Sequence, residues 1–242
     1  RLLRQPYIKE IHSMSIKPGT QTLLLSLCSM LALYTVAQAA DQPAHNFDRW
    51  EKSIAQFEKQ DKAQGIQEDG ILFVGSSSIR MWDLKKYFPE LPVINRGFGG
   101  SEIVDSTHFA DRIILKHKPK VIFLYAGDND IARGRTAKEV AGDFKQFVSV
   151  VHKALPETRI VFIAVKPSLS RWKLAGTMQE ANKLIKKQCE KHDYLAFADV
   201  WDPMLGEDGK PRPELFKKDG LHMEHAGYLI WKKAVEPYFP QN

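Results

Sequence analysis

The chain has 242 residues, which suits one globular domain or one domain with an appendage. Hydrophobic residues make up 43% and charged residues 26%, so the composition excludes a disordered or collagen-like chain. The formal net charge is +6, but residues 1–40 carry +3 of it, and the other basic residues are scattered, often beside acidic ones. This pattern indicates a solvated surface, and we expect no nucleic-acid partner.

Residues 1–40 have the pattern of a secretory signal. Lys17 precedes an uncharged, leucine-rich run over 20–40, which closes on Ala37-Gln38-Ala39. A basic start, an apolar centre and a small-residue exit are the three regions of a signal peptide. We therefore expect an exported protein, periplasmic or secreted, that is cleaved near Ala39/Ala40. After cleavage we expect no stable membrane insertion, whereas an uncleaved apolar run of about 20 residues would anchor the chain in a membrane.

The rest of the chain, residues 41–242, is expected to form a single domain. Met14 is the expected start residue, and the residues before it are assigned no function. Cys28 falls in the signal segment and Cys189 is alone in the predicted domain, so we expect no disulfide there. Few histidines accompany this lone cysteine, which disfavours a structural zinc site, and no cofactor or metal is expected.

Short apolar runs alternate with amphipathic stretches along the predicted domain. The apolar runs predict strands over 71–74, 92–95, 121–125, 160–164 and 194–198, and the amphipathic stretches predict helices over 46–64, 103–117, 136–154, 174–192 and 225–235. Strands are apolar throughout where helices cover both faces of a parallel sheet. The order therefore predicts an α/β fold, a three-layer α/β/α sandwich around a five-stranded, mainly parallel sheet. In such sheets, functional residues collect at the carboxyl ends of the strands.

Four short polar motifs lie at these strand ends or just before the last helix. In chain order they are Gly75-Ser76-Ser77-Ser78, Gly97-Phe98-Gly99-Gly100, Gly127-Asp128-Asn129-Asp130 and Asp219-Gly220-Leu221-His222. Each has an ordinary structural explanation when taken alone, such as a helix cap or a turn. The glycine cluster does not have the GxGxxG spacing, which disfavours dinucleotide binding.

Together the four motifs supply the parts of a nucleophilic hydrolase. A serine at a sharp strand–helix turn is presented at the sheet edge, and its own N–H points where an oxyanion would form. A glycine in the next loop offers a second N–H, and the amide of Asn129 offers a third donor. His222 can remove the serine proton, and Asp219, three residues earlier, can orient the imidazole.

From about Ile71 to Tyr228 the chain resembles the SGNH superfamily of GDSL-type esterases and lipases, with all four motifs in order. This resemblance implies a flavodoxin-like α/β/α fold. It also implies a role for each catalytic residue. Ser77 would be the nucleophile and His222 the general base, which Asp219 would orient. Gly100 and Asn129 would be oxyanion donors. The N–H of Ser77 would be a further oxyanion donor.

The first motif departs from the family pattern at one position. The usual Gly-Asp-Ser is Gly75-Ser76-Ser77 here, so a shorter hydroxyl replaces the aspartate that often braces the turn. Ser77 keeps the family spacing from Gly75, and we therefore take it, rather than Ser76 or Ser78, as the nucleophile.

The predicted function is that of an exported serine ester hydrolase whose substrate is a small-molecule, carbohydrate or lipid ester. Phe98, Arg133, Arg171 and Trp172 fall in loops after the second, third and fourth strands, and are candidates to line the substrate pocket. Packing beneath a loop explains Trp172 equally well. Arg96 and Arg133 are weaker candidates for meeting an anionic substrate. No long apolar lid is present in the sequence, which favours short acyl groups such as acetyl over bulky lipid.

Two alternative functions are left open by the sequence. Asp219, His222 and His225 could hold a metal ion in a metal-dependent hydrolase. A catalytically silent relative of the fold could instead bind glycans, with Ser76 as a sign of lost activity. The acyl and alcohol specificity and the oligomeric state are not determined by the sequence.

Overall fold

The computed structural model describes residues 45–240. The predicted signal segment, its cleavage near Ala39/Ala40, Met14 and Cys28 lie outside the described residues. Among residues 45–240, no helix is both long and apolar enough to cross a membrane.

Five parallel strands form one sheet in the order β2-β1-β3-β4-β5. The strands are β1 (Ile71–Gly75), β2 (Val93–Gly97), β3 (Val121–Tyr125), β4 (Arg159–Ile163) and β5 (Leu195–Ala198). This is the strand order of flavodoxin-like folds, in which sites form where the order reverses, here between β1 and β3. The predicted fold class is confirmed, and all five strands run parallel.

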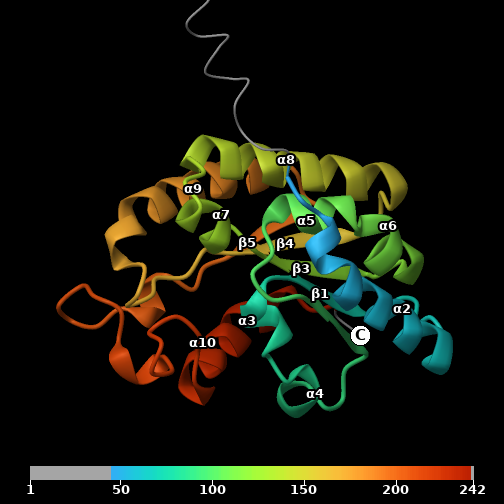
Figure 1. Ribbon diagram of the computed structural model, residues 1–242, viewed down its shortest axis with the longest axis horizontal. Helices are drawn as coiled ribbons and strands as arrows, with labels where there is room; N and C mark the ends of the chain where they lie inside the picture. The colour runs from blue at the N-terminus through green and yellow to red at the C-terminus, as the bar shows by residue number, and fades with distance from the viewer. Residues whose placement is uncertain (1–44, 241–242) are drawn as a thin grey trace, which may run out of the picture. The chain divides into compact units, whose positions relative to one another are not determined.

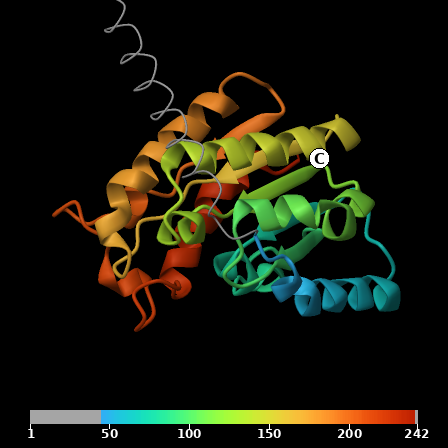
Figure 2. The same cartoon turned by 45° about the horizontal axis from the view of Figure 1, so that its top comes forward.

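Helices cover both faces of the sheet (Figures 1 and 2). One face carries α2 (Glu51–Gln64), α5 (Ile103–His108), α6 (Ala110–Ile113), α8 (Ala137–Ala154) and α9 (Ala175–Cys189). The other face carries α3 (Ser77–Arg80), α4 (Leu84–Tyr87) and α10 (His225–Val235). A hydrophobic core lies on each face of the sheet, and successive strand residues point alternately into one core and the other. Leu72 and Val74 pack against the first group of helices, whereas Ile71 and Phe73 pack against the second.

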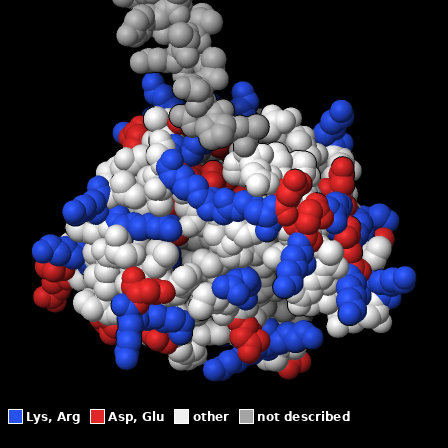
Figure 3. All heavy atoms as spheres, in the orientation of Figure 1, with Lys and Arg blue, Asp and Glu red and all other residues white. Residues whose placement is uncertain are grey.

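The remaining helical segments are short and lie at the ends of these elements. They are α7 (Asp128–Ala132) and the 3₁₀ helices η1 (Asp48–Trp50), η2 (Leu115–His117), η3 (Trp172–Leu174), η4 (Asp202–Met204), η5 (Pro213–Leu215) and η6 (Glu236–Tyr238). Figure 3 shows basic side chains interspersed with acidic ones over the viewed face of the molecule.

One predicted helix is wrong in its extent. The segment 103–117, expected as a single helix, is divided into α5, α6 and η2. The divisions fall at Phe109 and Ile114, whose backbone angles leave the helical region and whose side chains are both buried in the core. No glycine or proline marks either position, so the pattern of apolar residues alone carries no signal of the breaks.

Candidate active site

The turn between β1 and α3 depends on Gly75. Its φ is +129°, and a Cβ at this position would lie 1.9 Å from the carbonyl oxygen of Tyr125 on β3. Only glycine fits such a close approach of two backbones. The N–H of Ser76 donates to the same Tyr125 oxygen at 2.9 Å, and the chain then turns so that Ser77 becomes the first residue of α3. The turn therefore presents Ser77 at the carboxyl edge of the sheet.

The three consecutive serines have different surroundings. Ser76 is fully buried and Ser78 is 2% exposed, whereas Ser77 is only half-buried and faces a cleft. The end of α3 is held by Asn95, whose side-chain amide donates to the carbonyl oxygen of Ile79 at 2.8 Å. The local support of the turn thus comes from a neighbouring strand, and of the three serine hydroxyls it is that of Ser77 that meets a histidine.

Asp219, His222 and Ser77 form a hydrogen-bonded relay. His222 Nε2 lies 3.0 Å from Ser77 Oγ, and His222 Nδ1 lies 2.6 Å from Asp219 Oδ2. The other carboxylate oxygen of Asp219 accepts the backbone N–H groups of Leu221 and His222, each at 2.9 Å. The hydrogen bond from the His222 side chain, helped by these N–H groups, lowers the pKa of Asp219 to about 2. An ionised Asp219 accepts a proton-bearing Nδ1, which leaves Nε2 free to take the proton of Ser77.

The loop that carries this pair closes on itself. The N–H of Lys217 donates to the carbonyl oxygen of His222 at 2.7 Å, and the N–H of Gly220 donates to Lys217 at 2.8 Å. Phe216 and Met223 bridge the two sides of the loop, which leads directly into α10. The loop therefore holds His222 over the start of α3, although 145 residues separate it from Ser77 in the chain.

Two other predicted residues lie in the same cleft as Ser77 and His222. Gly100, at the end of the loop after β2, has a φ of +77° and lines the cleft. Asn129, the second residue of α7, is 8% exposed and also lines it. The side-chain N–H₂ of Asn129 donates to the carbonyl oxygen of Ser101 at 3.0 Å, which leaves one N–H for the cleft. The structure thus brings Ser77, His222 and the two predicted oxyanion donors to one edge of the sheet.

The cleft has a volume of about 500 Å³ and includes residues that the sequence pattern did not single out. Trp50 and Ser53 reach it from η1 and α2, and Arg80 reaches it from the end of α3. Gly99 and Leu221, which belong to two of the polar motifs, complete the lining. Trp50 belongs to the apolar stripe of the predicted first helix, so nothing in the sequence distinguished it from a core residue.

The four predicted substrate-lining residues have different positions. Arg171 lines the cleft, as expected. Phe98 does not, because it is fully buried and packs edge-to-face against Trp50, with ring centroids 5.6 Å apart. Trp172 stacks on Trp201 at 6.2 Å and packs against the core, so the packing explanation applies to it.

Arg133, the fourth of these residues, supports the cleft from behind. It forms an ion pair with Glu102, and its Nη2 donates to the carbonyl oxygen of Gly100 at 3.0 Å. These contacts hold the loop that carries Gly100. The expectation that Arg133 meets an anionic substrate therefore gives way to a structural role.

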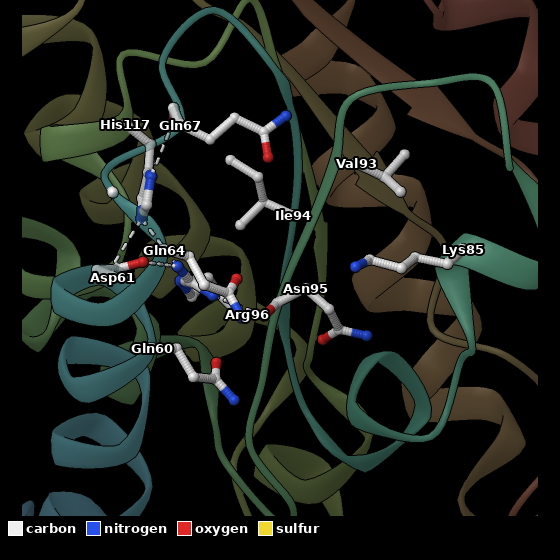
Figure 4. A pocket seen from close by; sticks show the side chains of 11 residues that line it. Gln60, Asp61, Gln64, Gln67, Lys85, Val93, Ile94, Asn95, Arg96 and His117 are labelled. Carbon is white, nitrogen blue, oxygen red and sulfur yellow. Dashed lines mark hydrogen bonds and ion pairs between the residues drawn. The ribbon is translucent and has the colours of Figure 1, made fainter.

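Arg96 lies in a different pocket, which has a volume of about 370 Å³ between the end of α2 and the edge strand β2 (Figure 4). It is 6% exposed, forms an ion pair with Asp61 and hydrogen-bonds His117 Nε2 at 3.1 Å. Lys116 also pairs with Asp61, at 2.6 Å. The expectation that Arg96 meets the substrate is wrong, because its charge is already paired and its pocket does not contain Ser77.

The alternative metal site is also wrong. His225 is the first residue of α10, and its Nδ1 lies 2.6 Å from the hydroxyl of Tyr87. Within residues 45–240, no three His, Cys, Asp or Glu side chains are placed to hold one metal ion. Asp219 and His222 therefore pair with each other and not with His225.

Comparisons with known proteins identify the family of the chain and proteins that share its fold. The model of the GDSL-like Lipase/Acylhydrolase family matches residues 78–230, a range that begins one residue after Ser77 and includes Gly100, Asn129, Asp219 and His222. The human platelet-activating factor acetylhydrolase IB subunit alpha1 is 24% identical over 178 residues, which cover 70% of this chain and 74% of that protein.

Two solved structures share the fold. A GDSL-like lipase from Bacteroides thetaiotaomicron superposes with a TM-score of 0.63 at 19% identity, covering 80% of this chain and 96% of that one. A variant of an acetyl-xylooligosaccharide esterase from Geobacillus stearothermophilus superposes with a TM-score of 0.59 at 18% identity, covering 73% and 97%.

Proposed function

The chain belongs to the GDSL-like lipase/acylhydrolase family, and from this premise we propose that it is an exported serine ester hydrolase with Ser77 as nucleophile and His222 as general base. The observation that carries the proposal is the relay from Asp219 through His222 to Ser77. The 2.6 Å contact lies within one loop, and the 3.0 Å contact joins that loop to Ser77 at the start of α3, 145 residues away in the chain. Such a relay activates a hydroxyl that is otherwise a weak nucleophile.

The proposed reaction is acyl transfer to water. Ser77 Oγ attacks the ester carbonyl carbon while its proton passes to His222 Nε2. The resulting oxyanion accepts hydrogen bonds from the N–H groups of Ser77 and Gly100 and from the amide of Asn129. When the tetrahedral intermediate collapses, the alcohol leaves with the proton from His222. Water then attacks the acyl-enzyme in the same way and releases the carboxylic acid and Ser77.

We propose short acyl groups, acetyl above all, as the substrate class. The cleft is open and is lined by Gly99, Gly100 and Trp50, and a Cβ at Gly100 would lie 3.3 Å from the Trp50 ring, which leaves little room for a bulky acyl chain beside Gly100. Relatives support the acetyl group, since one is named an acetylhydrolase and one an acetyl-xylooligosaccharide esterase. The alcohol component, carbohydrate or lipid, is the part of the substrate that these observations leave to experiment.

The proposed export depends on residues 1–40 alone. The basic start, apolar run and Ala37-Gln38-Ala39 exit support a cleaved signal and a periplasmic or secreted enzyme. Expression of the full chain, followed by N-terminal sequencing of the protein recovered outside the cytoplasm, tests this. A mature protein starting near Asp41 supports the proposal, and an uncleaved chain retained in the membrane contradicts it.

Covalent labelling tests the proposed chemistry. A fluorophosphonate should label the wild-type protein, and p-nitrophenyl acetate should be hydrolysed faster than longer acyl esters. Ser77→Ala should lose labelling and turnover. Ser76→Ala is the matched control, because it alters the same turn at a buried hydroxyl that does not face His222.

The outcomes separate the competing functions. Labelling that survives in Ser77→Ala but not in Ser76→Ala would move the nucleophile to the neighbouring residue. A folded wild-type protein that neither labels nor hydrolyses any ester would support the silent glycan-binding relative instead.

A further inference from the structure

Arg171 binds both residues that begin α7. Its Nη2 donates to Asn129 Oδ1 at 2.9 Å, and its Nη1 forms an ion pair with Asp128 Oδ2 at 3.0 Å. The Arg171 side chain is 18% exposed, so most of the guanidinium is withdrawn from solvent while one side borders the cleft. One planar group therefore clamps two consecutive residues, the second of which is the proposed oxyanion donor.

Behind this clamp lies a buried ionic cluster. Asp128 Oδ2 is 3.5 Å from Lys166 Nζ, and Lys166 Nζ donates to the hydroxyl of Tyr125 at 3.3 Å. Lys166 is 1% exposed, and this burial lowers the pKa of its ammonium group. Burying charges is costly unless they are paired, so two cations facing one carboxylate fix its position firmly. Asp128 in turn holds Arg171, while Lys166 links Asp128 to Tyr125 at the end of β3.

The amide of Asn129 has two ends of nearly the same shape, and its surroundings select one orientation. A carbonyl oxygen, that of Ser101, faces one end at 3.0 Å, while the guanidinium of Arg171 faces the other at 2.9 Å. Only Nδ2 can donate to Ser101, and only Oδ1 can accept from Arg171. The second N–H of Nδ2 is thereby left for the cleft. A charged donor on Oδ1 also polarises the amide and makes that N–H a stronger donor.

We propose that Arg171 is a positioning residue for ester hydrolysis, which acts through Asn129 by holding its amide with the N–H toward the oxyanion. Arg171 thus borders the cleft, as the sequence analysis expected, and this proposal adds a role that it exerts through Asn129. The inference rests on the proposed function, since it presumes that Asn129 stabilises an oxyanion. Because that oxyanion exists only during reaction, the contribution of Arg171 belongs to kcat and not to KM.

A double-mutant cycle tests the coupling. Loss of one oxyanion donor costs about 10²–10³-fold in rate, and loss of its orientation should cost a smaller share, about 10–10²-fold in kcat for Arg171→Met on p-nitrophenyl acetate. KM should change little on this neutral substrate. In an Asn129→Ala background, Arg171→Met should lower kcat by less than about 3-fold, because the group on which it acts is gone. Arg80→Met, another arginine of the cleft with no bond to Asn129, should have equal effects in both backgrounds.

Arg171→Met leaves Asp128 with one cation fewer, which could destabilise the fold. Two further variants, Arg171→Lys and Arg171→Ala, separate such destabilisation from a loss of positioning. Arg171→Lys keeps that charge but lacks the planar fork, so it should unfold at the wild-type temperature yet keep most of the loss in kcat. Added guanidinium ion should raise the kcat of Arg171→Ala but not that of Asn129→Ala/Arg171→Ala.

Three results would contradict the positioning role of Arg171. If the losses from Arg171→Met and Asn129→Ala multiply, or if Arg171→Lys restores kcat fully, the positioning role is wrong. If the loss falls on KM, Arg171 contacts the substrate instead. Because wild-type turnover and Ser77 labelling are measured separately, failure of this inference is distinguishable from failure of the proposed function.

Discussion

Replacing Gly75 with alanine tests how the fold presents Ser77, the proposed nucleophile. The new Cβ would lie 1.9 Å from the carbonyl oxygen of Tyr125, whereas real Cβ atoms essentially never approach a neighbour closer than 3.0 Å. The two backbones must therefore separate by about 1 Å. Tyr125 is the last residue of β3, which is hydrogen-bonded to β1 on one side and to β4 on the other. The backbone of Tyr125 therefore cannot move away without disturbing the sheet.

The expected cost follows from two contributions. A non-glycine residue at a φ of +129° is strained by about 1–3 kcal/mol, and the overlap adds about 1–3 kcal/mol of overpacking. We expect Gly75→Ala to lower the free energy of unfolding by about 2–6 kcal/mol. A shift of about 1 Å at Ser77 should also lower kcat/KM by about 10²-fold, because catalysis depends on near-attack geometry.

Denaturant unfolding and the hydrolysis of p-nitrophenyl acetate measure the two effects. Gly142→Ala is the matched control, since Gly142 lies in the exposed part of α8 and a Cβ there meets nothing within 4 Å. It should stabilise the protein by about 1 kcal/mol and leave the activity unchanged. A Gly75→Ala protein that keeps its stability within about 1 kcal/mol and its activity within about 10-fold would refute the reasoning.

Three further predictions concern other parts of the molecule. Asp219→Asn should lower kcat by at least about 10²-fold. The loss should be smaller than the ~10⁴-fold loss for a fully buried triad aspartate, because Asp219 is 48% exposed. Steady-state kinetics that show no loss in kcat would remove Asp219 from the relay. Cys189 is 6% exposed, and burial raises its pKa to about 12. In a Cys28→Ser background, a thiol reagent at pH 8 should therefore react with Cys189 only after the protein unfolds. Rapid reaction of the native protein would contradict this prediction. Burial lowers the pKa of His117 below its ordinary 6.5, so the unfolded chain binds this proton more readily. Stability from this group should be complete above pH 6.5 and decline below it, and urea titrations should show a weaker decline in His117→Gln; equal declines would contradict the assignment.

The order of apolar strands and polar motifs was sufficient to predict the fold and the edge of the sheet where the polar motifs meet, and the family resemblance selected Ser77 and Gly100 within their motifs. Each motif follows a strand or precedes the last helix, and in a parallel sheet the carboxyl ends of neighbouring strands share one edge. Connectivity alone therefore brings Ser77, Gly100 and Asn129 together. The spacing of Asp219 and His222 in a short loop likewise permits their contact in almost any fold.

Only the tertiary structure decided which side chains face the cleft and which face the core. Phe98 and Arg171 both follow strands in the sequence, yet one is fully buried and the other borders the cleft. Trp50 comes from a helix that no motif marks, and it reaches the cleft because α2 packs beside α6 on that side of the sheet. Such outcomes depend on side-chain direction and on partners distant in the chain, which residue spacing does not encode. The bond from Arg171 to Asn129 is of this kind, since 42 residues separate the two and only the packing of the loop after β4 against α7 brings them within 2.9 Å.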